Sequence, residues 1–386
     1  MEVLCTGHSS AMPYLGTVLK REPMAETVII PTRMGDSVYL TSSNIQRYMR
    51  LYFPRTFDDL VRKYEFMLLE QIDSDYFTPQ QFEWMRRGVQ DAGLGGLQDR
   101  GVMSMHTDLA IRWAESLLSD AFPNDADAVV GADFSRNGPL QVIINEDPEL
   151  PNVMKAFREV LRLDVGMWGT ILMTPRAGSK IYTWSKTGKF PEYAFPEPGL
   201  VPHILGWRYG EGYTWSIQDI IVLGFWDLNI NPYAVDVMIS MLICSTGRKL
   251  PEDVVLVHKL RDDFARYGEA KGFILSLMDF VAKFGANTAS LAEGLQELDA
   301  KWVAARQDYL SQEYASSFQA MQELLTRADG QREAALRLKD RALFWIYVIE
   351  WLSVSATFLV AGFAVWTLMV RRRLHREIAM TRLRGK

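Results

Sequence analysis

The chain has little cysteine: Cys5 and Cys244 are the only two among 386 residues. Both lie in apolar segments, so we expect two separate buried thiols and no disulfide. This excludes a small domain stabilised by disulfide bonds, but it does not assign the chain to a cellular compartment. With 48% hydrophobic and 23% charged residues, the sequence can form one large globular domain or two smaller ones.

Several short catalytic motifs are also missing. The sequence contains no Walker phosphate loop, no G-x-G-x-x-G fingerprint, no H-E-x-x-H and no G-x-S-x-G. The glycine-rich GLGG at 93–96 lacks the lysine and the helix start that a phosphate loop needs. The sequence therefore lacks the main signatures of nucleotide binding, of zinc hydrolases and of serine hydrolases. It predicts no cofactor and no metal.

Basic residues are concentrated in the tail. Residues 371–386 hold seven Lys or Arg against one acid, a net charge of +6. Since the whole chain carries −5, residues 1–370 carry −11. No basic stripe interrupts this acidic part, which argues against nucleic-acid binding.

One long apolar run stands out near the C-terminus. From Trp351 to Val370 there is no charged residue, and at about 1.5 Å rise per residue a helix of that length covers roughly 30 Å, the hydrocarbon thickness of a bilayer. Aromatic residues that favour the headgroup level lie near its ends: Trp345, Tyr347, Trp351 and Trp366. A basic stop follows: Arg371, Arg372 and Arg373. We predict a single membrane span, against the alternative of a buried core helix, which would show a polar face.

Small residues recur at every fourth position within this run: Ser353, Thr357 and Ala361. This spacing is typical of a helix-packing stripe, and it also occurs by ordinary composition in single spans. Either reading is open at this point.

The charge pattern predicts an orientation. Basic flanks stay in the cytoplasm, so the tail should be cytoplasmic and the large domain outside, although the flank before the span also carries basic residues. An exported domain needs a signal, and MEVLCTGHSS has no apolar h-region. We therefore expect a start upstream of Met1 or a removed signal. The alternative is a tail-anchored protein with its domain in the cytoplasm, for which the three arginines would have to cross the membrane.

Residues 1–250 alternate strand-like and helix-like runs, which predicts an α/β domain with a mainly parallel sheet. Strands are expected at 2–8, 26–32, 64–72 and 93–101, and helices at 78–93 and 113–122. The helix after Thr78 has a Pro at its first position and a capping box with Gln81.

The later part of this domain is richer in β-structure. Strands at 169–175 and 180–187 should be joined by a turn, and a hairpin over 203–219 should turn at Gly210-Glu211-Gly212. An apolar helix over 233–247 should close the domain.

From Pro251 the chain reads as helix. Apolar residues follow a 4-3 spacing in two sets, Leu291, Leu295, Leu298, Trp302, Ala305 and Tyr309, then Tyr314, Phe318, Met321, Leu325 and Ala328. This predicts an amphipathic stalk that either self-associates as a coiled coil or folds back on itself within one chain. The expected divisions are therefore an α/β domain at 1–250, a stalk at 251–342, a span at 343–370 and a basic tail at 371–386.

Four segments within residues 2–250 carry a family resemblance. They are VLCTGHSSAMPYL, YEFMLLEQIDSDYFTPQQFEWMRRGVQDAGLGGL, HILGWRYGEGYTW and the apolar helix before Gly247. The second has a strand ending in Ser-Asp, a helix starting at Pro and a glycine-rich strand, and the third contains a Y-G-x-G hairpin. The chain resembles the glutamine amidotransferase-like domain of large bacterial and archaeal membrane proteins. The resemblance implies a flavodoxin-like class I amidotransferase fold.

The enzymes of this fold use a nucleophilic cysteine at a strand-to-helix turn and a His oriented by a Glu. Here the corresponding strand ends in GLQDRG at 96–101 without a cysteine. Within residues 1–250 no histidine has Glu two residues later, and the same holds for His258; His375 has Glu377 two residues later, but it lies in the basic tail outside this domain. The five histidines are His8, His106, His203, His258 and His375. We therefore expect a catalytically silent relative that acts as a binding or scaffold subunit of a membrane or envelope complex, with protein partners or self-association.

Polar residues follow the predicted parallel strands at their carboxyl ends, where ligands bind in open α/β sheets. The candidates are His8, Asp73, Asp75, Asp99 and His106. The competing interpretation is that the aspartates cap turns and His8 bonds to the backbone. The alternatives to a scaffold are a hydrolase that acts at this edge on sugars or cell-wall material, and a ligand-sensing ectodomain that signals through the stalk.

Overall fold

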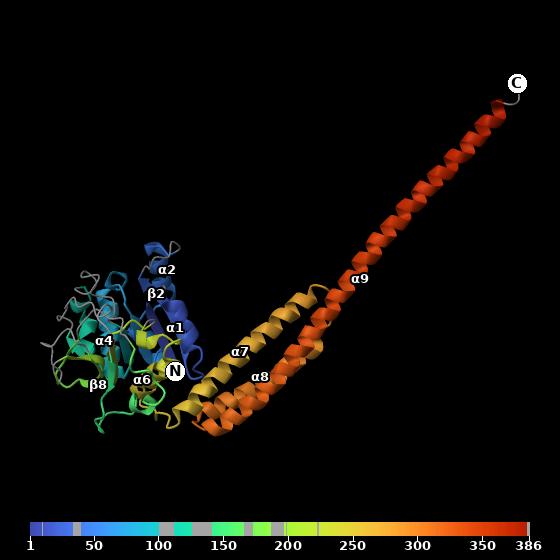
Figure 1. The fold of residues 1–386 in the computed structure, drawn as a ribbon. Helices are drawn as coiled ribbons and strands as arrows, with labels where there is room; N and C mark the ends of the chain where they lie inside the picture. The colour runs from blue at the N-terminus through green and yellow to red at the C-terminus, as the bar shows by residue number, and fades with distance from the viewer. Residues whose placement is uncertain are drawn as a thin grey trace. The chain divides into compact units, whose positions relative to one another are not determined.

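The computed structural model describes residues 1–9, 11–33, 40–99, 112–125, 141–165, 173–186, 197, 199–221 and 224–383. Its sheet has eight strands in the order β2-β1-β3-β4-β10-β9-β8-β6 (Figure 1). The five parallel strands are β1 (Glu2–His8), β2 (Glu26–Arg33), β3 (Phe66–Glu70), β4 (Gly95–Asp99) and β10 (Gly212–Ile217). The α/β class and the mostly parallel sheet expected from the sequence are confirmed.

Both faces of the parallel strands are buried, because their side chains alternate between two cores. Val3, Cys5 and Leu68 belong to one core, whereas Leu4 and Met67 belong to the other. The first core is covered by α1 (Met12–Leu19) and α6 (Ala234–Ser245), and the second by α2 (Ser42–Tyr52), α3 (Phe57–Lys63) and α4 (Pro79–Ala92).

Helix α4 begins as the sequence predicts. The Thr78 hydroxyl accepts from the Gln81 N–H at 3.2 Å, and the Gln81 side chain accepts from the Thr78 N–H at 2.8 Å. The helix ends at Gly93, whose φ of +74° is the left-handed conformation that glycine adopts without strain.

The other half of the sheet is antiparallel. Strand β9 (Leu200–Tyr209) forms a hairpin with β10, and β8 (Lys180–Lys186) and β6 (Gln141–Ile144) follow. The hairpin turns at Gly210, with a φ of +62°, as predicted. In the described part of 169–187, the short strand β7 (Thr174–Pro175) and β8 are joined by a turn, as predicted. Strand β7 pairs with β5 (Asn124–Asp125) in a separate two-stranded sheet.

The helix predicted over 113–122 is only partly α-helical. Trp113 and Ala114 are α-helical, and Leu117–Ala121 form the 3₁₀ helix η3. The Ser116 hydroxyl donates to the Trp113 carbonyl at 2.7 Å, and the Ser119 hydroxyl to the Ser116 carbonyl at 2.8 Å. Serine hydroxyls that occupy backbone carbonyls compete with the α-helical ladder, which favours the tighter turn. Other short 3₁₀ helices among the described residues are η1 (Ser74–Tyr76), η5 (Lys155–Phe157) and η6 (Gly224–Trp226).

Three long helices complete the chain: α7 (Val254–Ala282), α8 (Ala289–Leu310) and α9 (Tyr314–Leu383). The chain divides into a first unit, Met1–Ala265 with Arg306–Phe318, and a second unit, Arg266–Ala305 with Gln319–Lys386. Within the second unit, Leu291, Leu295 and Leu298 are at most 4% exposed. This part of the predicted apolar stripe is therefore buried inside one chain.

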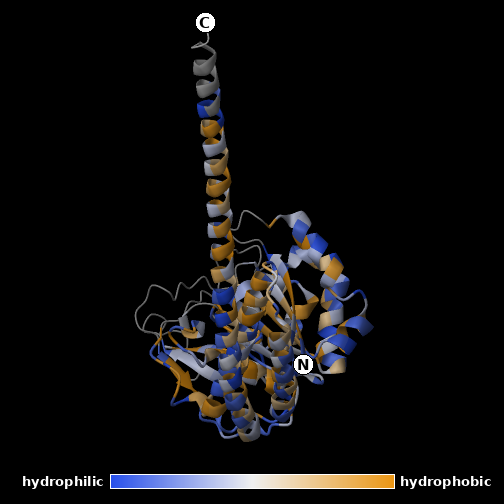
Figure 2. Cartoon of the chain, turned by 90° about the vertical axis from the view of Figure 1, so that its right-hand side faces the viewer, coloured by the Kyte–Doolittle hydropathy of each residue, from blue (hydrophilic) through white to orange (hydrophobic). Residues whose placement is uncertain are grey.

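Among the described residues, α9 is the one helix that is long and apolar enough to cross a membrane, by length and composition. None of the other residues that the structure describes buries its apolar window. Figure 2 shows the hydrophobic band along this helix and the hydrophilic turn that follows it. In the sequence, the basic stop begins at Arg371, directly after Val370.

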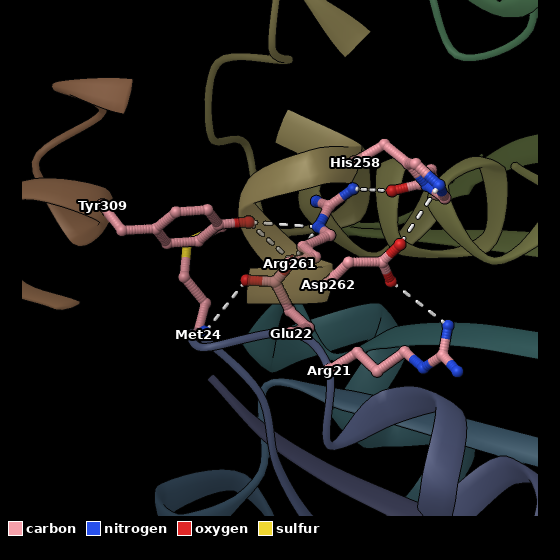
Figure 3. Close-up of polar contacts among 8 residues, drawn as sticks. Arg21, Glu22, Met24, His258, Arg261, Asp262 and Tyr309 are labelled. Atoms are coloured by element: carbon pink, nitrogen blue, oxygen red, sulfur yellow. Dashed lines mark hydrogen bonds and ion pairs between the residues drawn. The ribbon is translucent and has the colours of Figure 1, made fainter. Parts of the chain in front are cut away.

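A buried charge network lies inside the first unit, beneath the start of α7 (Figure 3). The Arg261 guanidinium donates to Glu22 at 2.6 Å and to Asp236 at 2.6 Å. The Tyr309 hydroxyl donates to the same Glu22 carboxylate at 2.9 Å. The network therefore joins α7 and the end of α8 to α6 and to the loop between α1 and β2.

Candidate functional site

A row of buried carboxylates follows the carboxyl edge of the parallel strands. Glu70 ends β3, Asp99 ends β4, and Asp219 lies two residues after β10. They are between 0% and 1% exposed. Strand register places Glu70 opposite Asp99, and Asp99 opposite Ile217. Neighbouring strands thus bring the three acids to one edge, where open α/β sheets bind their ligands.

Glu70 lies between β1 and β4, at the point where the strand order changes direction from β2-β1 to β3-β4. Its carboxylate accepts from the His8 N–H at 2.7 Å and from the Gln71 side-chain amide at 3.1 Å. The close approach depends on Gly7, the register partner of Glu70, because a Cβ there would lie 2.8 Å from the Glu70 Cβ.

Arg33, at the end of β2, supplies positive charge near this edge. It is 8% exposed, and its guanidinium donates to the Gln71 side-chain oxygen at 3.0 Å. Burial lowers the pKa of Arg33, and the nearby carboxylates of Glu70, Asp73 and Asp99 oppose that change. Gln71 connects the two charges, since its amide donates to Glu70 while its oxygen accepts from Arg33.

The protonation of Glu70 is strongly perturbed. Burial raises its pKa well above the ordinary value of 4.5, and the neighbouring Asp99 charge raises it further. The hydrogen bond from His8 and the charge of Arg33 act in the opposite direction without cancelling this rise.

We expect the stability of the wild-type chain to fall as the pH rises from about 4.5 through the raised pKa of Glu70. Glu70 binds its proton more tightly in the folded state than in the unfolded state, so the protonated form stabilises the fold. The free energy of unfolding therefore falls as the pH rises and the proton is lost. Glu70→Gln, which has no proton to lose, should flatten this dependence. Urea unfolding between pH 4.5 and pH ~8 measures the effect. Exposed Glu252→Gln is the control, and equal slopes for Glu70→Gln and wild type would contradict the assignment.

A second polar cluster lies beside the row of acids. The His203 ring contacts the Asp219 carboxylate at 2.9 Å through Nε2 and the Thr183 hydroxyl at 3.0 Å through Nδ1. This hydroxyl, imidazole and carboxylate follow the order of a catalytic triad. All three side chains are completely buried, however, so a substrate cannot reach the hydroxyl in this conformation.

The predicted edge residues meet different environments. The His8 N–H bonds to Glu70, and Asp99 accepts from the Ile221 N–H at 2.9 Å. Asp73 caps η1 by accepting from the Asp75 N–H at 3.1 Å, and burial raises the pKa of Asp73. Asp75 pairs with Arg112 at 2.7 Å. His106 lies outside the described residues.

Glu70, Arg33 and Asp219 were missed by the sequence analysis. Glu70 lies near the carboxyl end of the apolar run 64–72, and Arg33 directly follows the run 26–32. A charge at the carboxyl end of an otherwise apolar strand was the available signal. Asp219 follows a strand whose edge position depends on the non-local pairing of β10 with β4.

These acids are not arranged around a metal. Within the part of the chain that the structure describes, no group of three His, Cys, Asp or Glu side chains could hold a metal ion. The carboxylates instead bond to backbone amides and to neighbouring side chains.

Both cysteines are free thiols. Burial raises the pKa of Cys5 to about 12 and that of Cys244 to about 11. A thiol attacks as its thiolate, so neither group is an activated nucleophile at neutral pH.

The predicted membrane residues lie on α9 and are exposed. Trp345, Tyr347 and Trp351 are between 54% and 74% exposed. The small residues Ser353, Thr357 and Ala361 are exposed too, and the Thr357 hydroxyl donates to the Ser353 carbonyl at 2.8 Å. Arg371, Arg372 and Arg373 follow on the same helix.

No protein-family model matches the chain, and no curated protein matches it. Among solved structures it is similar to "Cytoplasmic Protein STM1381 from Salmonella typhimurium LT2", at 12% identity and a TM-score of 0.45, over 64% of this chain and 99% of that one. It is also similar to "Exo-beta-1,4-mannosidase Op5Man5 from Opitutaceae bacterium strain TAV5", at 12% identity and a TM-score of 0.31, over 63% of this chain and 35% of that one. Likenesses at these scores assign no function.

Proposed function

We propose that the chain is a membrane-anchored, catalytically silent amidotransferase-like protein that acts as a binding or scaffold subunit of a membrane or envelope complex. The observation that carries this proposal is the apolar window of α9, which is not buried by any other segment among the described residues. A continuous apolar surface of this size needs a partner that excludes water, and a bilayer matches its length.

The sheet supports the amidotransferase-like part of the proposal. The parallel strands follow the order β2-β1-β3-β4-β10, which is the 2-1-3-4-5 order of flavodoxin-like sheets. The raised pKa values of the buried Cys5 thiol and of the partly buried Cys244 thiol favour a silent relative over an active one.

The edge acids favour a scaffold over a hydrolase or a ligand sensor. The two alternatives, a hydrolase and a ligand-sensing ectodomain, both require a ligand at this edge. Glu70 and Asp99 are 1% exposed and are occupied by internal hydrogen bonds, as expected for groups that hold the sheet edge together.

Membrane extraction tests the anchor. The full chain should stay with membranes after alkaline carbonate and salt washes and should be released by detergent. Lysine at both Leu359 and Gly362 should move it into the soluble fraction, because each central Lys costs roughly 2.5–3.5 kcal/mol of insertion. Lysine at both Phe273 and Val303, which lie outside the apolar run, is the matched control and should leave the chain in the membrane.

Two further measurements address orientation and assembly. We propose that the basic tail is cytoplasmic and the large domain lies on the other side, so protease added to the cytoplasmic face should spare the large domain. Crosslinking in membranes should give species larger than the monomer. Release of the wild-type chain by carbonate would contradict the membrane anchor. Recovery of a monomer alone would contradict the scaffold role.

A further inference from the structure

The turn between α7 and α8 carries an exposed aromatic pair. Phe280 and Phe284 are 38% and 49% exposed, and their ring centroids are 5.1 Å apart. We call residues 280–288 the hairpin tip. All of it belongs to the second unit, together with the apolar part of α9. Two adjacent exposed phenylalanines form a small apolar patch that a neighbouring surface would cover.

Helix α9 runs alongside α7 and α8 below this tip. The Arg332 guanidinium lies 5.2 Å from the centroid of the Phe273 ring on α7. A groove of 380 Å³ between α7 and α9 is lined by residues that include Ala270 and Ala328. On the other side, a Cβ at Gly294 of α8 would lie 2.6 Å from Gln331 Cδ. Figure 1 shows α7 and α8 ending beside α9, which continues beyond them.

These contacts fix the level of the hairpin tip along α9. Phe284 lies eleven residues beyond Phe273, or about 16 Å at about 1.5 Å per residue, level with residue ~343 of α9. From α8, Ala289 precedes Gly294 by five residues, which places the start of α8 level with residue ~336. The tip is therefore beside the segment 336–343.

The apolar part of α9 begins directly after that segment. At about 1.5 Å rise, residues 344–370 cover about 40 Å, close to the roughly 40–45 Å of a bilayer with its headgroups. The first residues of this run are the exposed aromatics Phe344, Trp345 and Tyr347. The hairpin tip thus lies at the level where the headgroups of a spanned bilayer would begin.

We propose that the hairpin tip is a second membrane contact, in which Phe280 and Phe284 enter the headgroup region of the leaflet beside α9. The inference rests on the proposed membrane anchor. The one charged residue of the tip, Lys283, pairs at 2.9 Å with Asp279, which directly precedes the tip and balances its charge. Aromatic insertion therefore drives the contact, and it does not require anionic lipid. The contact would hold the second unit at a fixed tilt to the membrane.

Depth measurements on the full chain test this contact. One cysteine at a time replaces Phe284, Tyr347, Phe358 or Val303, and it is labelled with an environment-sensitive fluorophore. The labelled chain is placed in phosphatidylcholine nanodiscs whose lipids carry a quenching spin label on either the headgroup or the acyl chain. Val303 is 60% exposed on α8 and lies below the tip, so it serves as the matched aqueous control. The native thiols are buried or partly buried with raised pKa values, and unsubstituted chain measures their background labelling.

Headgroup quenching at Phe284→Cys should match that at Tyr347→Cys and exceed that at Val303→Cys several-fold. Equal quenching at positions 284 and 303, with strong acyl-chain quenching at 358, would overturn the hairpin contact and leave the anchor intact. A label at 284 that is shielded from water but not quenched by lipid would overturn it too, because a second chain would then cover the tip. Absence of quenching at 358 would overturn the anchor and the contact together.

Discussion

Arg261→Leu is expected to lower the free energy of unfolding of the first unit by roughly 3–5 kcal/mol, because it leaves buried carboxylates without their cation. The Arg261 side chain is 4% exposed, and its partners Glu22 and Asp236 are 0% and 3% exposed. Burial alone would lower the pKa of this guanidinium, but the facing Tyr309 and the two carboxylates raise it well above its usual value. Urea unfolding of the full chain in detergent micelles, followed by tryptophan fluorescence, measures the loss.

Arg21→Leu is the matched control for this substitution. The Arg21 side chain is 38% exposed and makes one ion pair, with Asp262 at 3.3 Å. Exposed ion pairs contribute about 0–1 kcal/mol, so this substitution should change the free energy of unfolding little.

A rescue separates charge from packing. Adding Glu22→Gln and Asp236→Asn to Arg261→Leu should recover part of the lost stability, because the neutral amides no longer require a cation. An Arg261→Leu variant as stable as Arg21→Leu would show that the network does not stabilise the packing of the start of α7 and the end of α8 within the first unit.

The strands of the parallel sheet could be predicted because their signal is local. Strand β1 has the predicted bounds 2–8, and β2 and β4 lie within two residues of theirs. A run of apolar residues with a glycine at its end identifies such a strand whatever its partners are. The β9–β10 hairpin was equally readable, since Gly210 supplies the positive φ that its turn needs.

The pairing of the short strands could not be predicted in the same way. Thr174 lies opposite Asp125, far away along the chain, and only folding of the whole unit selects that partner. The segment 113–122 has helical composition, but the hydroxyls of Ser116 and Ser119 bond locally to carbonyls. Sequence periodicity does not report which of two hydrogen-bonding patterns such serines adopt.

The candidate edge was found only in part for a related reason. His8 and Asp99 were identified because each ends a predicted strand, yet Glu70 ends one as well and was passed over for Asp73 and Asp75. The sequence shows that an acidic residue lies at a strand end, but it does not show that the side chain is buried. Burial depends on the register of Glu70 with Gly7 and Asp99, and that register is a property of the folded sheet.

Gly7→Ala is expected to destabilise the first unit by roughly 3 kcal/mol, from overpacking and from a weakened buried hydrogen bond. A Cβ at this position would overlap the Glu70 carbonyl oxygen, and neither atom can move away without shifting a central strand. Separation of β1 from β3 would also lengthen the His8 N–H bond to Glu70, so the loss should appear first at the sheet edge. Hydrogen exchange of peptides covering 2–9 and 66–71, together with urea unfolding, measures both effects.

Gly268→Ala is the control that isolates the collision from the general effect of replacing glycine. Gly268 lies within α7 with no atom within 4 Å of a Cβ at that position, so alanine should stabilise the helix by up to about 1 kcal/mol. The two substitutions add the same methyl group and should act with opposite sign. If Gly7→Ala left the exchange of the His8 amide unchanged, the sheet edge would tolerate a wider spacing. Glu70 would then not depend on Gly7 for its place between β1 and β4, and the buried row of acids would owe its geometry to its own hydrogen bonds.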